Sequence, residues 1–125
     1  MKEWSNQWKS SIKPRKQRKY VLNAPLHTRN NFMKTHISKE LRGKYKMRNI
    51  RVRKGDIVKI LRGSFKGMSG KINKVDLKLL RVFIDGIVIT KRDGTKALYP
   101  LHPSNVIITE LETSDHRRLN EVNKQ

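Results

Sequence analysis

The basic and glycine residues between positions 62 and 71 are the part of this chain best suited to chemistry. Three cations and three glycines occur there, in the order Arg62, Gly63, Lys66, Gly67, Gly70 and Lys71. Glycine can adopt the positive φ of a tight turn, and its missing side chain lets another molecule approach the backbone amides. Lysine neutralises phosphate, and arginine can bind one phosphate with two donors or stack on an exposed base. We call residues 62–71 the basic loop, and we expect it to bind an anion while its glycines form the turn.

Phe65 lies in the middle of the basic loop. It is a candidate for stacking on a base, and plugging the mouth of a small barrel is the alternative. A nucleotide-binding phosphate loop is not predicted, because its GxxxxGK pattern would need glycine six positions before Lys71, where Phe65 stands. Ile72 also replaces the hydroxyl residue that follows the lysine in that pattern.

Residues that could support catalysis or bind a metal are scattered. No histidine lies at metal-ligand spacing from another, and the chain has no cysteine. The acidic residues of the central part fall at expected strand ends and turns, where carboxylates are usually solvated or cap a turn. The residues concerned are His27, His36, His102 and His116, and Asp56, Asp76, Asp85 and Asp93. We predict that the chain is not an enzyme and uses no metal, cofactor or small-molecule substrate.

The charge of the chain points to a polyanionic partner. Thirty Lys and Arg stand against ten Asp and Glu in 125 residues, which gives a net charge of +20. So large a charge of one sign repels itself unless a polyanion neutralises it, and nucleic acid is the commonest one. Residues 1–50 hold 14 basic and two acidic residues, including a cluster of Lys13, Arg15, Lys16, Arg18 and Lys19. We expect this cluster to contact phosphate; a solvated face and a localisation signal are the alternatives.

No secretion or membrane signal is visible. The first twenty residues lack the apolar segment of a signal peptide, and no apolar run approaches the length of a membrane span. We therefore predict a soluble, cytoplasmic protein with no membrane partner.

The first 50 residues give a weak structural signal. Residues 1–37 show no sustained period, and Pro14 and Pro25 are expected to interrupt any helix, so we predict a basic, extended N-terminal arm. Trp4 and Trp8 are four positions apart, which favours a helical turn or two over residues 3–12. These indoles either pack on the domain or stack on bases. Residues 38–49 predict one short helix that Ser38 caps.

From residue 50 onward the pattern becomes β-like. Short alternating apolar runs predict strands at 56–61, 71–76, 80–85, 87–90, 96–99 and 106–109, with a bulge or bend at Gly86 and a hairpin turn at Asp93 and Gly94. Strands this short and this numerous favour a small, strongly bent barrel over residues 50–111. Residues 112–125 are polar and charge-balanced, and we expect a frayed or partly helical tail.

The run from Lys54 to Val75 resembles the KOW motif, through Lys54-Gly55-Asp56, Arg62-Gly63, Lys66-Gly67 and Gly70-Lys71-Ile72. Further runs at 23–27, 38–42, 51–56 and 102–106 are similar to universal large-subunit ribosomal protein twenty-four, and closest to its archaeal type. The resemblance covers residues 19 to 111. It implies a mainly β fold, a small SH3-like (KOW) barrel with a basic N-terminal extension and one short helix.

The resemblance also implies a function. Members of this family are structural constituents of the large ribosomal subunit, bind its rRNA early in assembly, and lie near the peptide exit tunnel. The implied partners are large-subunit rRNA, neighbouring large-subunit proteins, and targeting factors at the tunnel exit. The residues expected to contact rRNA are Lys13, Arg15, Lys16, Arg18, Lys19, Arg29, Arg53, Lys54, Arg62, Ser64, Lys66, Gly67, Lys71, Lys91, Arg92 and His102, and those expected to form turns are Gly55, Gly63, Gly67 and Gly70.

Two other functions remain open from the sequence. A KOW module of a transcription elongation factor would bind RNA polymerase or nascent RNA, although such modules usually accompany another domain. A non-specific nucleic-acid compaction protein would bind duplex DNA and rRNA equally well.

Overall fold

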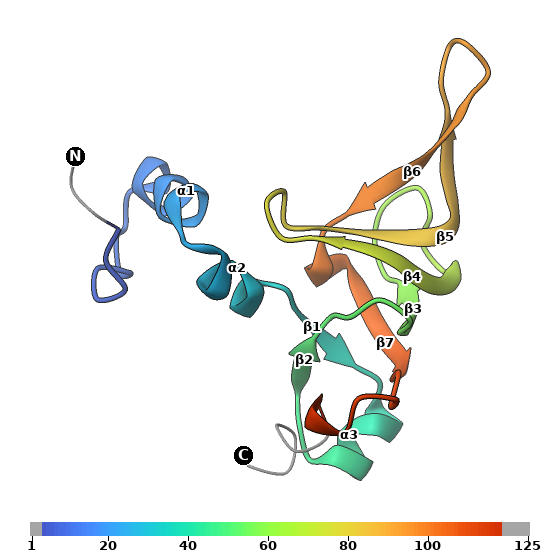
Figure 1. The fold of residues 1–125 in the computed structure, drawn as a ribbon, viewed down its shortest axis with the longest axis horizontal. Coiled ribbons are helices and arrows are strands. Elements are labelled where there is room, and N and C mark those ends of the chain that lie inside the picture. Colours follow the sequence, from blue (N-terminus) through green and yellow to red (C-terminus); the bar gives the residue numbers. More distant parts are fainter. Residues whose placement is uncertain (1–3, 119–125) are drawn as a thin grey trace.

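The computed structural model describes residues 4–118, and these build one mixed β-sheet with helices at its ends (Figure 1). The helices are α1 Pro14–Asn23, α2 Leu26–Phe32, α3 Lys39–Tyr45 and the 3₁₀ helix η1 Pro103–Asn105. The strands are β1 Lys34–Ile37, β2 Asn49–Arg51, β3 Ile57–Ile60, β4 Ser69–Asp76, β5 Arg81–Thr90, β6 Lys96–Leu101 and β7 Val106–Glu110. Their order in the sheet is β2-β1-β7-β3-β4-β5-β6. The prediction of a mainly β fold of the small SH3-like type is confirmed.

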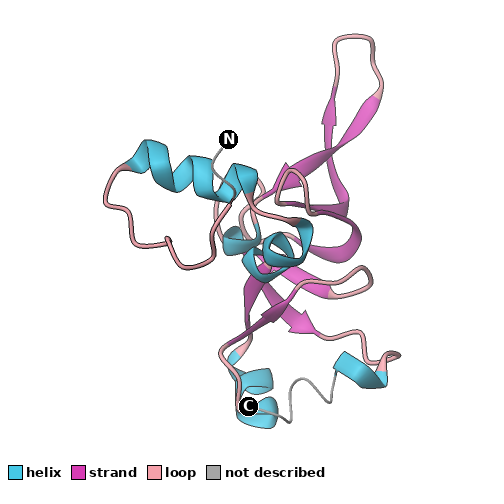
Figure 2. Cartoon of the chain, turned by 60° about the vertical axis from the view of Figure 1, so that its left-hand side comes forward, coloured by secondary structure: helices cyan, strands magenta, loops and turns pink. Residues whose placement is uncertain are grey.

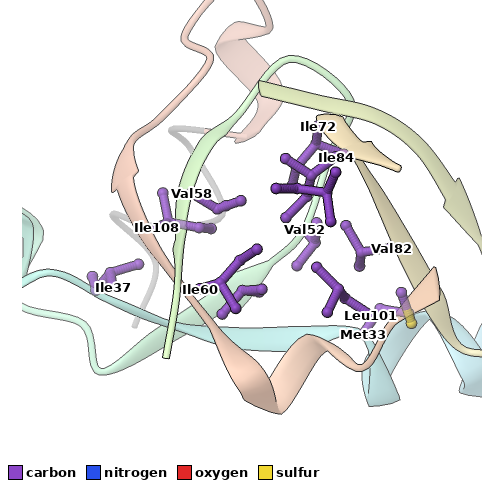
Figure 3. Packing of buried hydrophobic residues seen from close by; sticks show 12 residues of the cluster. Met33, Ile37, Val52, Val58, Ile60, Ile72, Val82, Ile84, Leu101 and Ile108 are labelled. Carbon is purple, nitrogen blue, oxygen red and sulfur yellow. The ribbon is translucent and has the colours of Figure 1, made fainter. Parts of the chain in front are cut away.

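Alternation of apolar and polar residues explains the strands. In β3, Val58 and Ile60 are buried while Lys59 between them is exposed. Successive side chains of a strand point to opposite faces, so this pattern turns one face of the sheet inward. Figure 3 shows Val58 and Ile60 on one side of the core, with Ile72 and Ile84 of β4 and β5 across from them. Burying such side chains is the main source of stability in a domain of this size.

In the long strand β5, the alternation of buried and exposed side chains is interrupted half-way. Val82 and Ile84 are buried, but the next buried residue is Ile87, three positions on. Gly86 has a φ of 83°, and the register with β6 shifts between Phe83 and Val88. One extra residue at a bulge restores the inward face. The two strands predicted at 80–85 and 87–90 are therefore one strand, bent where the glycine was expected to bend it.

The N-terminal segment differs from the predicted extended arm. It contains α1 and α2, followed by β1, which lies inside the sheet between β2 and β7. Pro14 is the first residue of α1 and Pro25 precedes α2. Proline is well suited to the first turn of a helix, because the amide it lacks would have no partner there. The two prolines thus begin helices instead of interrupting them, and the segment predicted as an extended arm contains two α-helices in its described part.

The predicted helix near Ser38 forms as α3. The Ser38 hydroxyl accepts a hydrogen bond from the backbone N–H of Leu41 at 3.4 Å, and Lys46 ends the helix in the left-handed conformation. Residues 4–13 form no helix around the tryptophans, and residue 3 of that predicted turn lies outside the described residues.

The beginning of the C-terminal tail is docked against the sheet. Arg118 is buried, and its guanidinium donates to both carboxylate oxygens of Asp56, at 2.6 and 2.7 Å. Of the two roles expected for Asp56, solvation is excluded because the side chain is fully buried between this arginine and two backbone amides. The capping role holds, because the carboxylate accepts from the backbone N–H of Arg53 across the turn at 54–55. The remainder of the predicted tail, 119–125, lies outside the described residues.

Candidate nucleic-acid interface

The basic loop leaves the sheet between β3 and β4. The backbone N–H of Ile60 donates to the carbonyl of Met68 at 2.8 Å, and the N–H of Gly67 donates to the carbonyl of Ile60 at 2.9 Å. These bonds close the base of the loop. The chain turns at Gly63 and Gly67, whose φ values are 95° and 88°. A Cβ at either position would meet nothing within 4 Å, so backbone conformation alone favours glycine there.

Gly70 has a different role from the turn that was predicted. It lies within β4 and its φ is not positive. A Cβ at this position would stand 2.7 Å from the carbonyl oxygen of Asp85 and 2.7 Å from the side chain of Ile84. Glycine is therefore needed so that β4 and β5 can approach each other closely. Gly55, at φ 99°, does lie in a turn.

The polar side chains of the basic loop face solvent. Arg62, Ser64, Lys66 and Lys71 are all exposed. Phe65 is half-buried instead, and it packs against the core with its ring centroid 5.1 Å from that of Tyr99. The loop thus has an apolar inner side and a cationic outer side.

The turn that carries His102 lies beside the basic loop. The backbone N–H of Leu61 donates to the carbonyl of Asn105 at 2.8 Å, which joins the two segments. His102 is exposed, and its Nδ1 accepts a hydrogen bond from the backbone N–H of Ser104 at 3.2 Å. Partial desolvation, followed by the nearby charge of Arg81, lowers the pKa of His102 below 6.5. The imidazole is therefore neutral at pH 7.

A second group of cations lies at the tip of the β5–β6 hairpin, which projects beyond the rest of the sheet (Figure 2). Lys91 and Arg92 are exposed there. Asp93 accepts hydrogen bonds from the hydroxyl and the backbone N–H of Thr95, and these bonds lower the pKa of its carboxyl group. The tip is thus a well-ordered turn that presents two cations.

A third group of cations belongs to α1 and its start. Lys13, Arg15, Arg18 and Lys19 are exposed, and Lys16 is half-buried. Figure 1 shows α1 standing away from the sheet. These cations therefore lie on a different part of the molecule from the basic loop.

The two tryptophans beside α1 have different environments. The Trp4 indole N–H donates to the carbonyl of Tyr20 at 3.1 Å, and its ring packs on the Tyr20 ring. Trp8 is 57% exposed, with the Lys16 ammonium 4.8 Å from its ring centroid. Packing within the protein thus accounts for Trp4, whereas Trp8 keeps an exposed aromatic face.

Two of the arginines expected to contact RNA are held within the chain. The Arg29 guanidinium donates to the carbonyls of Ala24, at 2.9 Å, of Lys78, at 2.7 Å, and of Leu22. It thereby ties α2 to the turn between β4 and β5. Arg53 pairs with Asp115, and this hydrogen bond lowers the pKa of the Asp115 carboxyl group. Lys54, next to Arg53, is exposed.

Three residues near these groups were not singled out from the sequence. Arg81 and Tyr99 line a cleft beside the basic loop, and Arg118 anchors the C-terminal segment. No local motif marks them, because each acts through contacts with residues distant in sequence. Within the described range, 4–118, no group of His, Asp or Glu side chains is arranged to hold a metal ion, and no helix has the length and apolar character needed to cross a membrane.

Comparison with known proteins identifies similar chains. A family model that describes the eukaryotic ribosomal proteins L26 and their archaeal counterparts matches residues 11–125. The large ribosomal subunit protein uL24 of Methanosphaera stadtmanae is 47% identical over 115 residues, which cover 92% of this chain and 98% of that protein.

Proposed function

The chain belongs to the uL24 family of ribosomal proteins, and on that premise we propose that it binds the rRNA of the large subunit by charge neutralisation and shape. As a member of this family it is a structural protein of the large ribosomal subunit, in the cytoplasm. The proposal concerns the RNA contact, its location on the chain, and the place of the protein in the particle.

The observation that carries the proposal is the distribution of unpaired cations. Among the described residues, the two ion pairs are Arg53 with Asp115 and Arg118 with Asp56. The exposed cations of the basic loop, the hairpin tip and α1 have no carboxylate partner within 4–118. Side chains of one sign, left unpaired on three separate projections, suit a partner that supplies many phosphates.

The three groups of cations differ in how they are held. The basic loop is fixed by its hydrogen bonds to β3, so it can dock against one RNA site with little loss of conformational freedom. The hairpin tip and α1 extend away from the sheet and can follow the RNA backbone at a distance (Figure 1). RNA duplexes are recognised mainly by shape and by phosphate and 2′-hydroxyl contacts, which suits this arrangement.

Salt dependence tests the proposal. Affinity for a fragment of large-subunit rRNA should fall steeply with salt, because each phosphate contact releases condensed counterions. A plot of the logarithm of the binding constant against the logarithm of the salt concentration has a negative slope. Replacing Lys66 and Lys71 together with glutamate should make that slope shallower by about 1.4 to 1.8, given about 0.7 to 0.9 per contact. The matched control reverses Lys39 and Lys44, two exposed lysines of α3, with the same change in net charge.

The comparison of the two variants decides the matter. If both lower the slope equally, the basic loop is not a contact surface, and net charge alone governs binding. If the affinity of the unaltered protein hardly changes with salt, charge neutralisation is not the mechanism. Circular dichroism of both variants establishes that each is folded.

The place of the protein in the particle is part of the same proposal. We expect it near the outer end of the peptide exit tunnel, joining early in assembly, beside neighbouring subunit proteins and within reach of targeting factors. Co-sedimentation on a gradient separates this from a transcription role, since the chain should follow large subunits and not RNA polymerase. Competition between rRNA and duplex DNA separates it from a compaction role, which predicts equal binding.

A further inference from the structure

A cleft of about 190 Å³ lies between the basic loop and the end of β6. Its walls include Phe65 from the loop, Tyr99 from β6, and Arg62, Arg81 and His102. These residues come from three separate parts of the chain and meet only in the folded protein. The cleft lies beside the loop proposed above to contact RNA.

The size of the cleft limits what it can hold. Pockets that enclose drug-sized molecules measure about 300 to 1,000 Å³. A cleft of 190 Å³ suits one planar ring system and not a whole free nucleotide. Any groups attached to that ring would have to lie outside the cleft, on the protein surface.

The aromatic residues offer a fixed stacking surface. Phe65 and Tyr99 are both half-buried and rest on the hydrophobic core, with their rings 5.1 Å apart and inclined by 52°. Because the core holds them in place, a planar ligand would not have to order them on binding. Bases of single-stranded or bulged RNA stack on such rings, whatever their identity.

The charge of the cleft selects the kind of ligand. Two arginines, Arg62 and Arg81, line it, and no acidic residue does. An aromatic side chain of a protein partner would gain nothing from cations beside it. A nucleotide base suits the cleft better, because the guanidinium groups can bind the phosphates on either side of the base.

Two polar groups can contact the edge of a base. Because His102 Nδ1 accepts from the Ser104 backbone N–H, the neutral ring carries its proton on Nε2, which is then a donor. Asn105 also lines the cleft and carries a side-chain amide. An amide offers both a donor and an acceptor.

We propose that this cleft captures one unstacked base of the bound rRNA, with Phe65 and Tyr99 as the stacking surface and Arg62 and Arg81 on the flanking phosphates. The inference rests on the proposed function, because it needs an RNA held at the basic loop. It adds a site for an unpaired nucleotide to a surface that otherwise recognises charge and shape.

The test uses the full chain and two RNA stems. One stem carries a single unpaired 2-aminopurine, and the other is the same stem without the bulge. The bulged stem should bind about 5- to 150-fold more tightly, the range expected for one base stacked on an aromatic ring. The fluorescence of its 2-aminopurine should fall on binding, because the base moves onto the protein rings.

Variants locate the effect. Phe65→Leu and Tyr99→Leu keep apolar side chains against the core but remove an aromatic ring, so each should reduce the ratio of bulged-stem to plain-stem affinity. Tyr99→Phe keeps the ring and should retain the advantage. Arg81→Gln leaves both rings in place and should also weaken the bulged stem selectively, which provides a test if a core-facing variant misfolds.

The outcomes separate the two proposals. Equal affinity for both stems, or unchanged 2-aminopurine fluorescence in the complex, would overturn the base-binding cleft while the RNA-binding function stands. If neither stem binds at low salt, both proposals fail. An advantage of the bulged stem that survives both leucine variants would place the base elsewhere on the protein.

Discussion

Replacing Arg118 with methionine should destabilise the protein markedly, although this residue lies in the segment predicted to be a frayed or partly helical tail. Its guanidinium donates to the two oxygens of Asp56 at 2.6 and 2.7 Å, and both side chains are almost fully buried. Breaking a buried ion pair by removing one partner costs about 3–5 kcal/mol, because the other charge stays buried without compensation. Asp56 would keep the backbone N–H groups of Arg53 and Glu112, at 2.9 and 3.0 Å. We therefore expect the lower end of that range, about 3 kcal/mol.

Denaturation by urea, followed by circular dichroism, measures this change. Both tryptophans lie before α1, so their fluorescence would report on the N-terminal segment and not on the sheet. A loss of about 3 kcal/mol is a large share of the about 5–15 kcal/mol that stabilises a typical protein. It should lower the melting temperature by on the order of 10 °C.

A control and a double variant make the test specific. Arg117→Met changes the exposed neighbour and should alter stability by less than about 0.5 kcal/mol. The double variant Asp56→Asn with Arg118→Met leaves no buried charge, so it should be less destabilised than the sum of its single variants. If Arg118→Met matches Arg117→Met, the C-terminal segment is not held by this ion pair and the reasoning fails.

Two further predictions concern a glycine pair and a carboxyl group. Gly70→Ala should destabilise the protein by about 1–3 kcal/mol in urea denaturation, since its Cβ would stand 2.7 Å from the Asp85 carbonyl oxygen. Gly43→Ala, in the open interior of α3, should instead stabilise the protein by about 0.5–1 kcal/mol. If Gly70→Ala leaves the stability unchanged, β4 and β5 do not approach each other closely. In an NMR titration, Arg53→Gln should raise the pKa of Asp115 toward its ordinary value of 3.8, because the hydrogen bond from Arg53 is the main cause of its lowering. The stabilisation by this pair is present above pH 3.8 and is lost as the pH falls through the lowered pKa, and an unchanged pKa in the variant would show that the pair does not form.

The strands from residue 57 onward were predictable because their signal is local. Val58 and Ile60 alternate with a charged residue, and Gly86 marks the bulge of β5. Predictions from glycine and proline were less certain, because each of these residue types has more than one structural role. Pro14 was expected to break a helix and instead begins one, and Gly70 was expected to turn the chain and instead lets two strands approach.

The candidate site was predictable only in part, because residue type does not show which contacts a side chain makes. The exposure of the cations in the basic loop follows from residue type, since burying an unpaired lysine or arginine of a glycine-rich turn would be unfavourable. Arg29 and Arg53 have the same residue types, yet the fold holds both by hydrogen bonds to distant residues. Sequence spacing contains no information about such contacts.

The sequence by itself determined the β-rich class, the turn at Gly63 and Gly67, and the excess of positive charge from which we predicted a polyanionic partner. These follow from residue type and short-range periodicity, which act on each segment separately. Only the tertiary structure decided that the N-terminal segment adds a strand to the sheet, that Arg118 closes over Asp56, and that Phe65 and Tyr99 meet beside two arginines. Each of these is a contact between segments far apart in the chain, and such a contact exists only when burial of the common core brings them together.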